Sequence, residues 1–183
     1  NLYFLNKNNG DLLRMIPTEE TIIKNEFINN LSLNNELTFF LNTYGSLYAI
    51  NNNSLKIKWF LNLNRSLNIN PSDLFQGNQI VNLKDKIAVS TNNFLYVINS
   101  NNGSVIFKKK FSTKIKPIIL NNYLFCITKN NFLISLDLIS GEIIYSYNIE
   151  QKIASFLDSK KKNIQIKSFL IADNHLIVFL ENS

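Results

Sequence analysis

Side chains that could do chemistry are few and scattered along this sequence. It has one histidine, His175, and one cysteine, Cys126, and each lies in an apolar run. A lone imidazole makes a poor metal site, and a thiol on an apolar strand is more often a small buried side chain than a nucleophile. We therefore expect His175 to be a core or rim residue and Cys126 to be buried, and a single cysteine allows no intrachain disulfide.

The aspartates lie in polar segments between apolar runs, where turn residues are usual: Asp73, Asp85, Asp137, Asp158 and Asp173. No Ser/His/Asp grouping, CxxC pair or glycine-rich phosphate loop accompanies them. The sequence therefore predicts a protein that is not an enzyme, with no catalytic residues, no metal and no cofactor.

Basic residues exceed acidic ones, 19 to 13, which gives a formal net charge of +6. Clustered lysine and arginine would suit nucleic-acid phosphates, but here the lysines are dispersed and few arginines could make bidentate contacts. The runs at 108–110 and 160–162 are typical of solvated strand edges and loops. We predict no nucleic-acid binding.

Polar segments separate the apolar runs of a repeated pattern, which is clearest at residues 93–110. Phe94–Ile98 is aromatic and branched, which favours a strand, and Ser100–Gly103 combines residues that favour a chain reversal. Ser104–Phe107 begins a second strand, and Lys108–Lys110 would keep it from pairing with other molecules. The stretch predicts a hairpin whose second strand is an edge strand.

Three further copies of this hairpin pattern occur, at 1–14, 46–59 and 131–145. Gly10 and Gly141 align with Gly103, whereas Leu55 stands at the turn-glycine position of the copy at 46–59. Two more apolar segments precede each copy except the first, for example 79–83 and 86–90 before Phe94, and 116–120 and 123–128 before Phe132. On this alignment Cys126 falls at Ala88.

Four strands in about 40 residues are typical of one blade of a β-propeller. We therefore expect an all-β fold made of four-stranded antiparallel blades, and we expect the chain to be a fragment of one β-propeller. The expected parts are a half blade at 1–16, blades at 27–64, 79–111 and 115–149, a half blade at 167–183, and insertions at 65–78 and 151–166.

The repeat resembles that of pyrroloquinoline-quinone (PQQ)-type propellers, also called quinoprotein-type. Leu47–Asn51 followed by Trp59, and Leu133–Asp137 followed by Gly141 and Tyr145, are similar to its Leu-Tyr-Ala-Leu-Asp, Thr-Gly and Trp positions. The family includes quinone-dependent alcohol dehydrogenases, sensor domains of membrane kinases, and the BamB-like scaffolds of the outer-membrane β-barrel assembly machinery. The adjacent cysteines typical of the dehydrogenases are not found, which argues against an enzyme. The insertion at 151–166, with its lysine cluster, resembles loops of BamB-like scaffolds, and this resemblance is the closest.

Two insertions are where binding residues are expected, because loops on a rigid scaffold usually carry them. In BamB-like proteins, a loop after the Trp-bearing strand contacts the barrel-forming subunit. By resemblance, Leu67, Ile69 and Asn70 are partner-binding residues, with Asn70 in place of an arginine; alternatively, Leu67 and Ile69 fill a gap between blades. In the second insertion, the spacing of Ile153, Phe156 and Leu157 predicts a helical turn.

The resemblance implies a non-catalytic periplasmic scaffold, a lipoprotein associated with the outer membrane. Its partners would be the barrel-forming subunit and unfolded outer-membrane proteins, which could dock by β-strand addition. Contact with the membrane would come only through a lipid anchor, and we expect the signal peptide and lipobox to lie outside this fragment. The alternative is a fragment of a PQQ-dependent dehydrogenase or of a ligand-sensing propeller.

Overall fold

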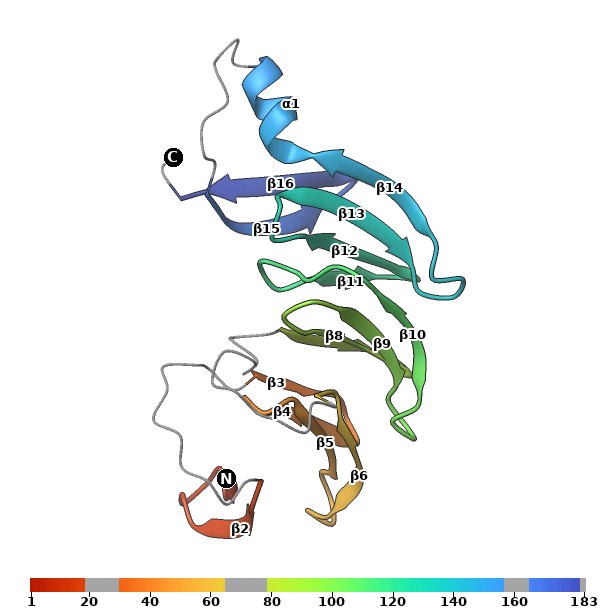
Figure 1. Ribbon diagram of the computed structural model, residues 1–183. Coiled ribbons are helices and arrows are strands. Elements are labelled where there is room, and N and C mark those ends of the chain that lie inside the picture. Colours follow the sequence, from red (N-terminus) through yellow and green to blue (C-terminus); the bar gives the residue numbers. More distant parts are fainter. Residues whose placement is uncertain (19–29, 65–78, 157–164, 182–183) are drawn as a thin grey trace. The chain divides into compact units, whose positions relative to one another are not determined.

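The computed structural model describes residues 1–18, 30–64, 79–156 and 165–181 (Figure 1). Apart from one short helix, the regular secondary structure of these residues is β-strand, and every strand pairing is antiparallel, as the repeat predicted. The chain divides into two compact units, Asn1–Gly77 and Asn78–Ser183. No helix among the described residues is long and apolar enough to cross a membrane.

The first unit contains a hairpin and a four-stranded sheet. The hairpin is β1 (Leu2–Leu5) and β2 (Leu12–Ile16), and the strands of the sheet follow one another in chain order: β3 (Asn30–Leu33), β4 (Leu37–Leu41), β5 (Ser46–Asn51) and β6 (Ile57–Asn62). Ile16 of the hairpin is buried with Phe40 and Tyr48 of the sheet, and Leu2 and Phe4 pack on this cluster. The Tyr48 hydroxyl also donates a hydrogen bond to the carbonyl of Thr18 (2.8 Å), so the hairpin is held by both apolar and polar contacts.

The second unit contains two complete four-stranded sheets, a short helix and a further hairpin. One sheet is β7 (Ile80–Leu83), β8 (Lys86–Ser90), β9 (Leu95–Asn99) and β10 (Val105–Lys109). The other is β11 (Ile118–Leu120), β12 (Tyr123–Ile127), β13 (Phe132–Asp137) and β14 (Ile143–Asn148). Then come α1 (Ile149–Phe156) and the hairpin of β15 (Ile166–Ala172) and β16 (His175–Leu180).

These sheets stack face to face because their strands alternate apolar side chains between two faces. Leu124 and Leu136 of the sheet β11–β14 are buried with Leu95 and Val97 of the sheet β7–β10. The opposite face of β11–β14 packs on the last hairpin, where Ile127, Phe125 and Leu133 meet Phe169 and the helix residue Ile153 in a second cluster. The sheet β11–β14 is therefore a layer between two apolar clusters.

The turn between the third and fourth strands has the same geometry in each copy of the repeat. Its first residue accepts backbone N–H groups on its side-chain oxygen: Asn51 from Ser54 (2.8 Å), Asn99 from Asn101 (2.9 Å) and Asp137 from Ile139 (2.6 Å). The fourth residue after it has positive φ, near +75° at Gly103 and Gly141 and +52° at Leu55. Leu55 therefore takes a conformation that a leucine adopts only at a cost.

The strand pairing confirms one prediction and corrects another. Lys108 and Lys109 lie on β10, which is an edge strand of its sheet, as predicted. The alignment of Cys126 with Ala88 is wrong by one residue, because Cys126 lies opposite Ile134 and it is Val89 that lies opposite the equivalent Tyr96. The hydrogen-bonded loop from Thr128 to Phe132 is one residue longer than the loop from Thr91 to Phe94, which shifts the alignment.

Candidate functional site: a groove between two sheets

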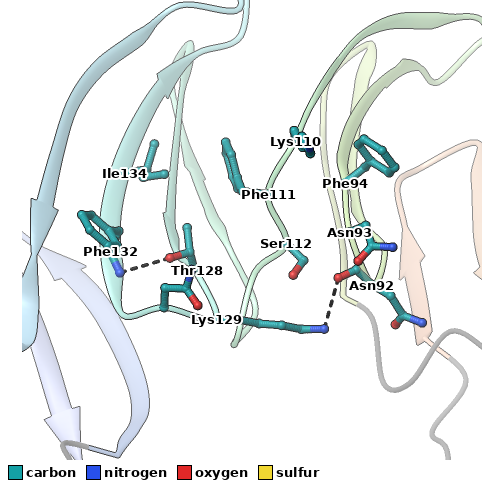
Figure 2. Close-up of a pocket in the computed structure, with 11 residues that line it drawn as sticks. Asn92, Asn93, Phe94, Lys110, Phe111, Ser112, Thr128, Lys129, Phe132 and Ile134 are labelled. Atoms are coloured by element: carbon teal, nitrogen blue, oxygen red, sulfur yellow. Dashed lines mark hydrogen bonds between the residues drawn. The ribbon is translucent and has the colours of Figure 1, made fainter. Parts of the chain in front are cut away.

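A groove of about 560 Å³ lies between the sheets β7–β10 and β11–β14 (Figure 2). Its walls come from three connections: β8 to β9, β10 to β11, and β12 to β13. The lining residues are Asn92, Asn93, Phe94, Lys110, Phe111, Ser112, Thr128, Lys129, Asn130, Phe132 and Ile134. The groove is therefore built mainly from loops that two packed sheets hold in place.

A threonine fixes each of the two strand connections that flank the groove. The Thr91 N–H donates to the carbonyl of Phe94 (2.7 Å), and the Thr91 hydroxyl oxygen accepts the Phe94 N–H (3.0 Å). At the equivalent place, the Thr128 N–H donates to the carbonyl of Phe132 (2.9 Å), and Thr128 Oγ1 accepts the Phe132 N–H (3.1 Å). Both loops are therefore held by paired hydrogen bonds that leave Phe94 and Phe132 at the groove wall.

The connection between β10 and β11 is tied to both sheets. The Thr113 N–H donates to Ser90 Oγ (2.8 Å), and the Lys129 N–H donates to the carbonyl of Ser112 (3.2 Å). At the mouth of the groove, Lys129 Nζ lies 3.3 Å from the carbonyl oxygen of Asn92, so its side chain spans the two sheets (Figure 2). Thr113 Oγ1 is buried, and no described residue forms a hydrogen bond with it.

A buried asparagine anchors the helix beside the groove. Asn131 is in the left-handed conformation, with φ of +58°, and its Nδ2 donates to Glu150 Oε1 (2.6 Å). Its carbonyl accepts the Ile149 N–H (3.0 Å), and its Oδ1 accepts from Lys114 Nζ (3.3 Å). Three segments are thereby joined at one side chain.

The groove offers cations, amides and aromatic faces rather than a nucleophile with its base. Lys110 and Lys129 are exposed, none of the eleven lining residues is acidic, and Phe94, Phe111 and Phe132 supply aromatic surface. Lys108 Nζ lies 5.1 Å above the centre of the Phe94 ring, a cation–π contact that adds positive charge to this wall. Such a surface suits an acidic segment that also carries apolar side chains.

The residues singled out from the sequence do not come together in one place. His175 is exposed at the start of β16, and Cys126 is fully buried on β12, where desolvation raises the pKa of its thiol to about 12. Of the aspartates, Asp85 lies in the β7–β8 turn beside Lys86, Asp173 lies in the β15–β16 turn, and Asp137 ends β13. Hydrogen bonds from the Ser140 and Ile139 N–H groups lower the pKa of Asp137.

Several sequence predictions fall outside the part of the chain that the structure describes. These are the partner-binding residues Leu67, Ile69 and Asn70, the aspartates Asp73 and Asp158, and the lysines at 160–162. In the second insertion, a helix is confirmed by α1, which contains Ile153 and Phe156. Within the described ranges, no three His, Cys, Asp or Glu side chains are placed to hold a metal ion.

Sequence reasoning missed the groove, although a signal for it was present. The segments Thr91-Asn92-Asn93-Phe94 and Thr128-Lys129-Asn130-Asn131-Phe132 are two versions of one loop. Each places a threonine, polar residues and a phenylalanine between the second and third strands of a blade. Their recurrence at the same place in successive repeats indicates two loops on the same side of neighbouring sheets.

Comparisons with known proteins give the fold its place among solved structures. No protein-family model and no curated protein matches the sequence. BamB from Moraxella catarrhalis is similar over 83% of this chain, with a TM-score of 0.61 and 14% identity, and this chain spans 42% of that protein.

A europium-containing methanol dehydrogenase is similar over 63% of the chain, with a TM-score of 0.52 and 12% identity, and 23% of that enzyme is covered. The quinohemoprotein alcohol dehydrogenase from Comamonas testosteroni is similar over 64% of the chain, with a TM-score of 0.52 and 10% identity, and 20% of it is covered. These similarities identify the four-stranded sheets as blades of a β-propeller fold, and at such identities they identify the fold alone.

Proposed function

We propose that this chain is part of a non-catalytic, BamB-like scaffold that binds a protein partner through the loops of its blades. The observation that supports this most is the extent of the structural similarity. The BamB structure matches 83% of the chain with a TM-score of 0.61, whereas the two dehydrogenases match 63% and 64% with TM-scores of 0.52.

In this proposal, the protein works in the periplasm at the outer membrane, to which a lipid anchor outside this sequence attaches it. Its partner is the barrel-forming subunit of the assembly machinery, with unfolded outer-membrane proteins as a second class of ligand. Leu67, Ile69 and Asn70 form one contact, because they follow the fourth strand of a blade at the place where BamB-like proteins carry their partner loop.

The groove between β7–β10 and β11–β14 forms the second contact of the proposed scaffold. The connection from β10 to β11, which carries Phe111 and Ser112, occupies the same place in its repeat as the 65–78 segment does after β6. Because Lys110 and Lys129 have no acidic neighbour in the lining, an acidic partner surface is favoured. Aromatic side chains of the groove would then cover apolar residues of that partner.

The first test is a pull-down of the purified barrel-forming subunit by the parent protein. Leu67→Glu with Ile69→Glu should abolish capture, and Phe132→Glu with Lys129→Glu should reduce it at least tenfold. Ile139→Glu is the matched control, because Ile139 is 66% exposed in a turn away from the groove lining. Undiminished capture by both double variants would overturn the proposal.

The ionic character of the second contact can be measured separately. Exposed charge pairs are screened by salt, so raising ionic strength from about 0.05 to 0.5 M should weaken binding through the groove lysines. The Lys110→Gln, Lys129→Gln variant should bind more weakly at low salt and should lose most of this salt dependence. A salt response identical to that of the wild type would exclude the groove lysines from the interface.

A second candidate function is a PQQ-dependent dehydrogenase, favoured by the similarity to the methanol and alcohol dehydrogenases. It is tested by incubating the parent protein with PQQ and Ca²⁺ and following alcohol oxidation with an electron-accepting dye. The scaffold proposal predicts no turnover above that of a protein-free control. Turnover that depends on the protein would replace the scaffold with the enzyme.

A further inference from the structure

The fourth strand of the sheet β11–β14 differs in charge from the fourth strands of the other complete sheets. Each of β6, β10 and β14 pairs with one strand only among the described residues, so all three are edge strands. Charged side chains on such an edge discourage pairing with another chain. β6 carries Lys58, and β10 carries Lys108 and Lys109, whereas β14 has the sequence IIYSYN. Of these three edges, β14 is therefore the one without a protecting charge.

β14 also exposes apolar side chains along its edge. Ile143 is 46% exposed, Ile144 is 55% exposed and Tyr147 is 49% exposed. Branched and aromatic side chains favour pairing with a neighbouring strand, and they contribute most where they meet similar side chains across the pair. β14 therefore offers an additional strand both backbone hydrogen-bonding groups and apolar contacts.

Positive charge lies beside the end of β14. Lys152, on the helix that follows, places its Nζ 5.8 Å from the centre of the Tyr147 ring. The acidic residue of the same helix, Glu150, accepts a hydrogen bond on Oε1 from Asn131 Nδ2 (2.6 Å). Lys152 is thus available to a carboxylate on a strand added beside Tyr147.

The groove between the sheets contributes further positive charge at this end. Ser146 and Asn148 of β14 lie opposite Ile134 and Phe132, and both of these line the groove with its two lysines (Figure 2). At the other end, Glu142 directly precedes the strand. Electrostatic complementarity therefore favours a partner that is acidic beside the end of β14 and uncharged beside its start.

We propose that β14 is a docking edge for an extended segment of a partner protein, which joins the sheet β11–β14 as a fifth, antiparallel strand. Antiparallel pairing is slightly the more stable, and it is the pairing used throughout this fold. The amino-terminal half of the bound segment is then acidic and lies beside Asn148. Its carboxyl-terminal half is apolar and lies beside Ile143 and Ile144.

This inference rests on the proposed scaffold function for the class of partner, a protein. It adds the edge, the mode of binding and the direction of the bound segment. Regular pairing of β14 with β13 runs from Tyr145 to Asn148, and Ile144 is the extra residue of a bulge. Because a bulge disturbs pairing, backbone hydrogen bonds to the segment are expected chiefly along Tyr145–Asn148. So short a contact should bind with micromolar rather than nanomolar affinity.

Binding of a synthetic peptide to the full chain tests the proposal. The probe carries an amino-terminal fluorophore; its first half alternates aspartate with threonine, and its second half alternates valine with threonine. The matched control has the same residues in reverse order, which would place its aspartates beside Glu142. Fluorescence anisotropy at low ionic strength should show the probe binding at least tenfold more tightly than the reversed peptide.

A lysine at the start of β14 should block the edge. Ile144→Lys should weaken probe binding at least tenfold, and the fold accepts this change because β6 has Lys58 at the same bulge position. Ile106→Lys is the matched control. Ile106 occupies the bulge position of β10 and is 42% exposed, so its substitution should leave probe binding unchanged.

Backbone methylation of the probe distinguishes strand addition from a purely apolar contact. Methyl groups on alternate backbone nitrogens remove the hydrogen-bond donors of one peptide edge, and two complementary peptides cover both edges. One of them should lose binding and the other should keep it, because only one edge of an added strand faces β14. This comparison leaves the protein unchanged, so it does not depend on how a variant folds.

Several outcomes would overturn the proposal: no probe binding, equal binding of the reversed peptide, equal effects of the two methylated peptides, or equal loss in Ile144→Lys and Ile106→Lys. A wild-type chain that sediments as a dimer, and that Ile144→Lys makes monomeric, would also overturn it, because a second copy would then occupy the edge. Probe binding without capture of the barrel-forming subunit would reject the proposed function and keep the docking edge. Capture of the subunit without probe binding would reject the docking edge alone.

Discussion

The complete sheets and the hairpins are built from the same repeat, but they differ in burial. Leu95 on β9 is fully buried, whereas Leu2, at the same position of the repeat on β1, is half-buried. Both strands are followed by the same turn, closed by Gly103 or Gly10. Local sequence therefore determines the hairpin, and the number of neighbouring strands and sheets determines how much apolar surface it buries.

The largest effect is expected from shortening a side chain in a complete sheet. Leu124→Ala leaves a cavity between two sheets and should lower the free energy of unfolding by about 2–5 kcal/mol. Ile177→Ala, on an edge strand where Ile177 is 41% exposed, should cost about 1 kcal/mol. Urea unfolding of the monomeric chain measures both, and equal costs would contradict the difference in packing.

Alanine substitutions at Gly10 and Gly141 distinguish the free-energy cost of a strained turn backbone from the cost of a steric clash with a neighbouring side chain. Gly10 and Gly141 both have positive φ, +77° and +75°, so alanine at either should cost about 1 kcal/mol in backbone strain. A Cβ at Gly10 would meet nothing within 4 Å, whereas at Gly141 it would lie 3.1 Å from Cδ1 of Phe107 in the neighbouring sheet. Gly141→Ala should therefore destabilise by about 1 kcal/mol more than Gly10→Ala in thermal unfolding. If the two variants melted alike, Phe107 would not be packed on this turn.

Leu55 offers a substitution that should stabilise the first unit. Its φ of +52° matches the turn glycines of the other copies, and Leu55→Gly should relieve the strain by up to about 1 kcal/mol. Leu55→Ala is the control, because it removes the side chain and keeps the unfavourable backbone. A midpoint in urea that rises for alanine and not for glycine would show that the side chain, rather than φ, limits stability here.

The smallest effect on stability is expected at the turn between β13 and β14, which begins with the carboxylate Asp137. Amide donors at Ser140 and Ile139 lower the pKa of Asp137 in the folded state below that of the unfolded chain. Asp137 therefore adds stability above its unfolded pKa, near 4, and this contribution is lost as pH falls through the folded pKa. Asp137→Asn resembles the Asn51 and Asn99 turns and should remove this pH dependence while keeping the turn. Stability curves from pH 2 to 7 that coincide for the two proteins would contradict this.

The sequence predicted the hairpins well because turn chemistry is local. Asn99 and Gly103 specify a reversal wherever they occur, and even Leu55 follows the same geometry, because the flanking strands pair and impose it. The register of β12 was missed by one residue because a single insertion between Thr128 and Phe132 leaves the apolar pattern of the strand unchanged. Such a shift in alignment is revealed by the register of strand pairing and not by the residue types of the strand.

The recurring loops were a signal for the groove, but its walls could not be predicted from them, because the walls depend on contacts between repeats. Lys129 reaches Asn92 in a different sheet, and Asn131 joins segments whose sequence gives no sign of their proximity. Leu67, Ile69 and Asn70 remain predictions, because they lie outside the described residues.

Amide hydrogen exchange on the monomeric chain is the most direct test of the central claim. It measures whether the number of neighbouring strands, rather than the local sequence, determines how well the backbone amides of each repeat are protected from exchange. We predict slow exchange in β8, β9, β12 and β13, which have a strand on both sides. We predict fast exchange in β1 and β16, which each pair with one strand among the described residues. Equal protection of β1 and β9 in the monomer would contradict the account.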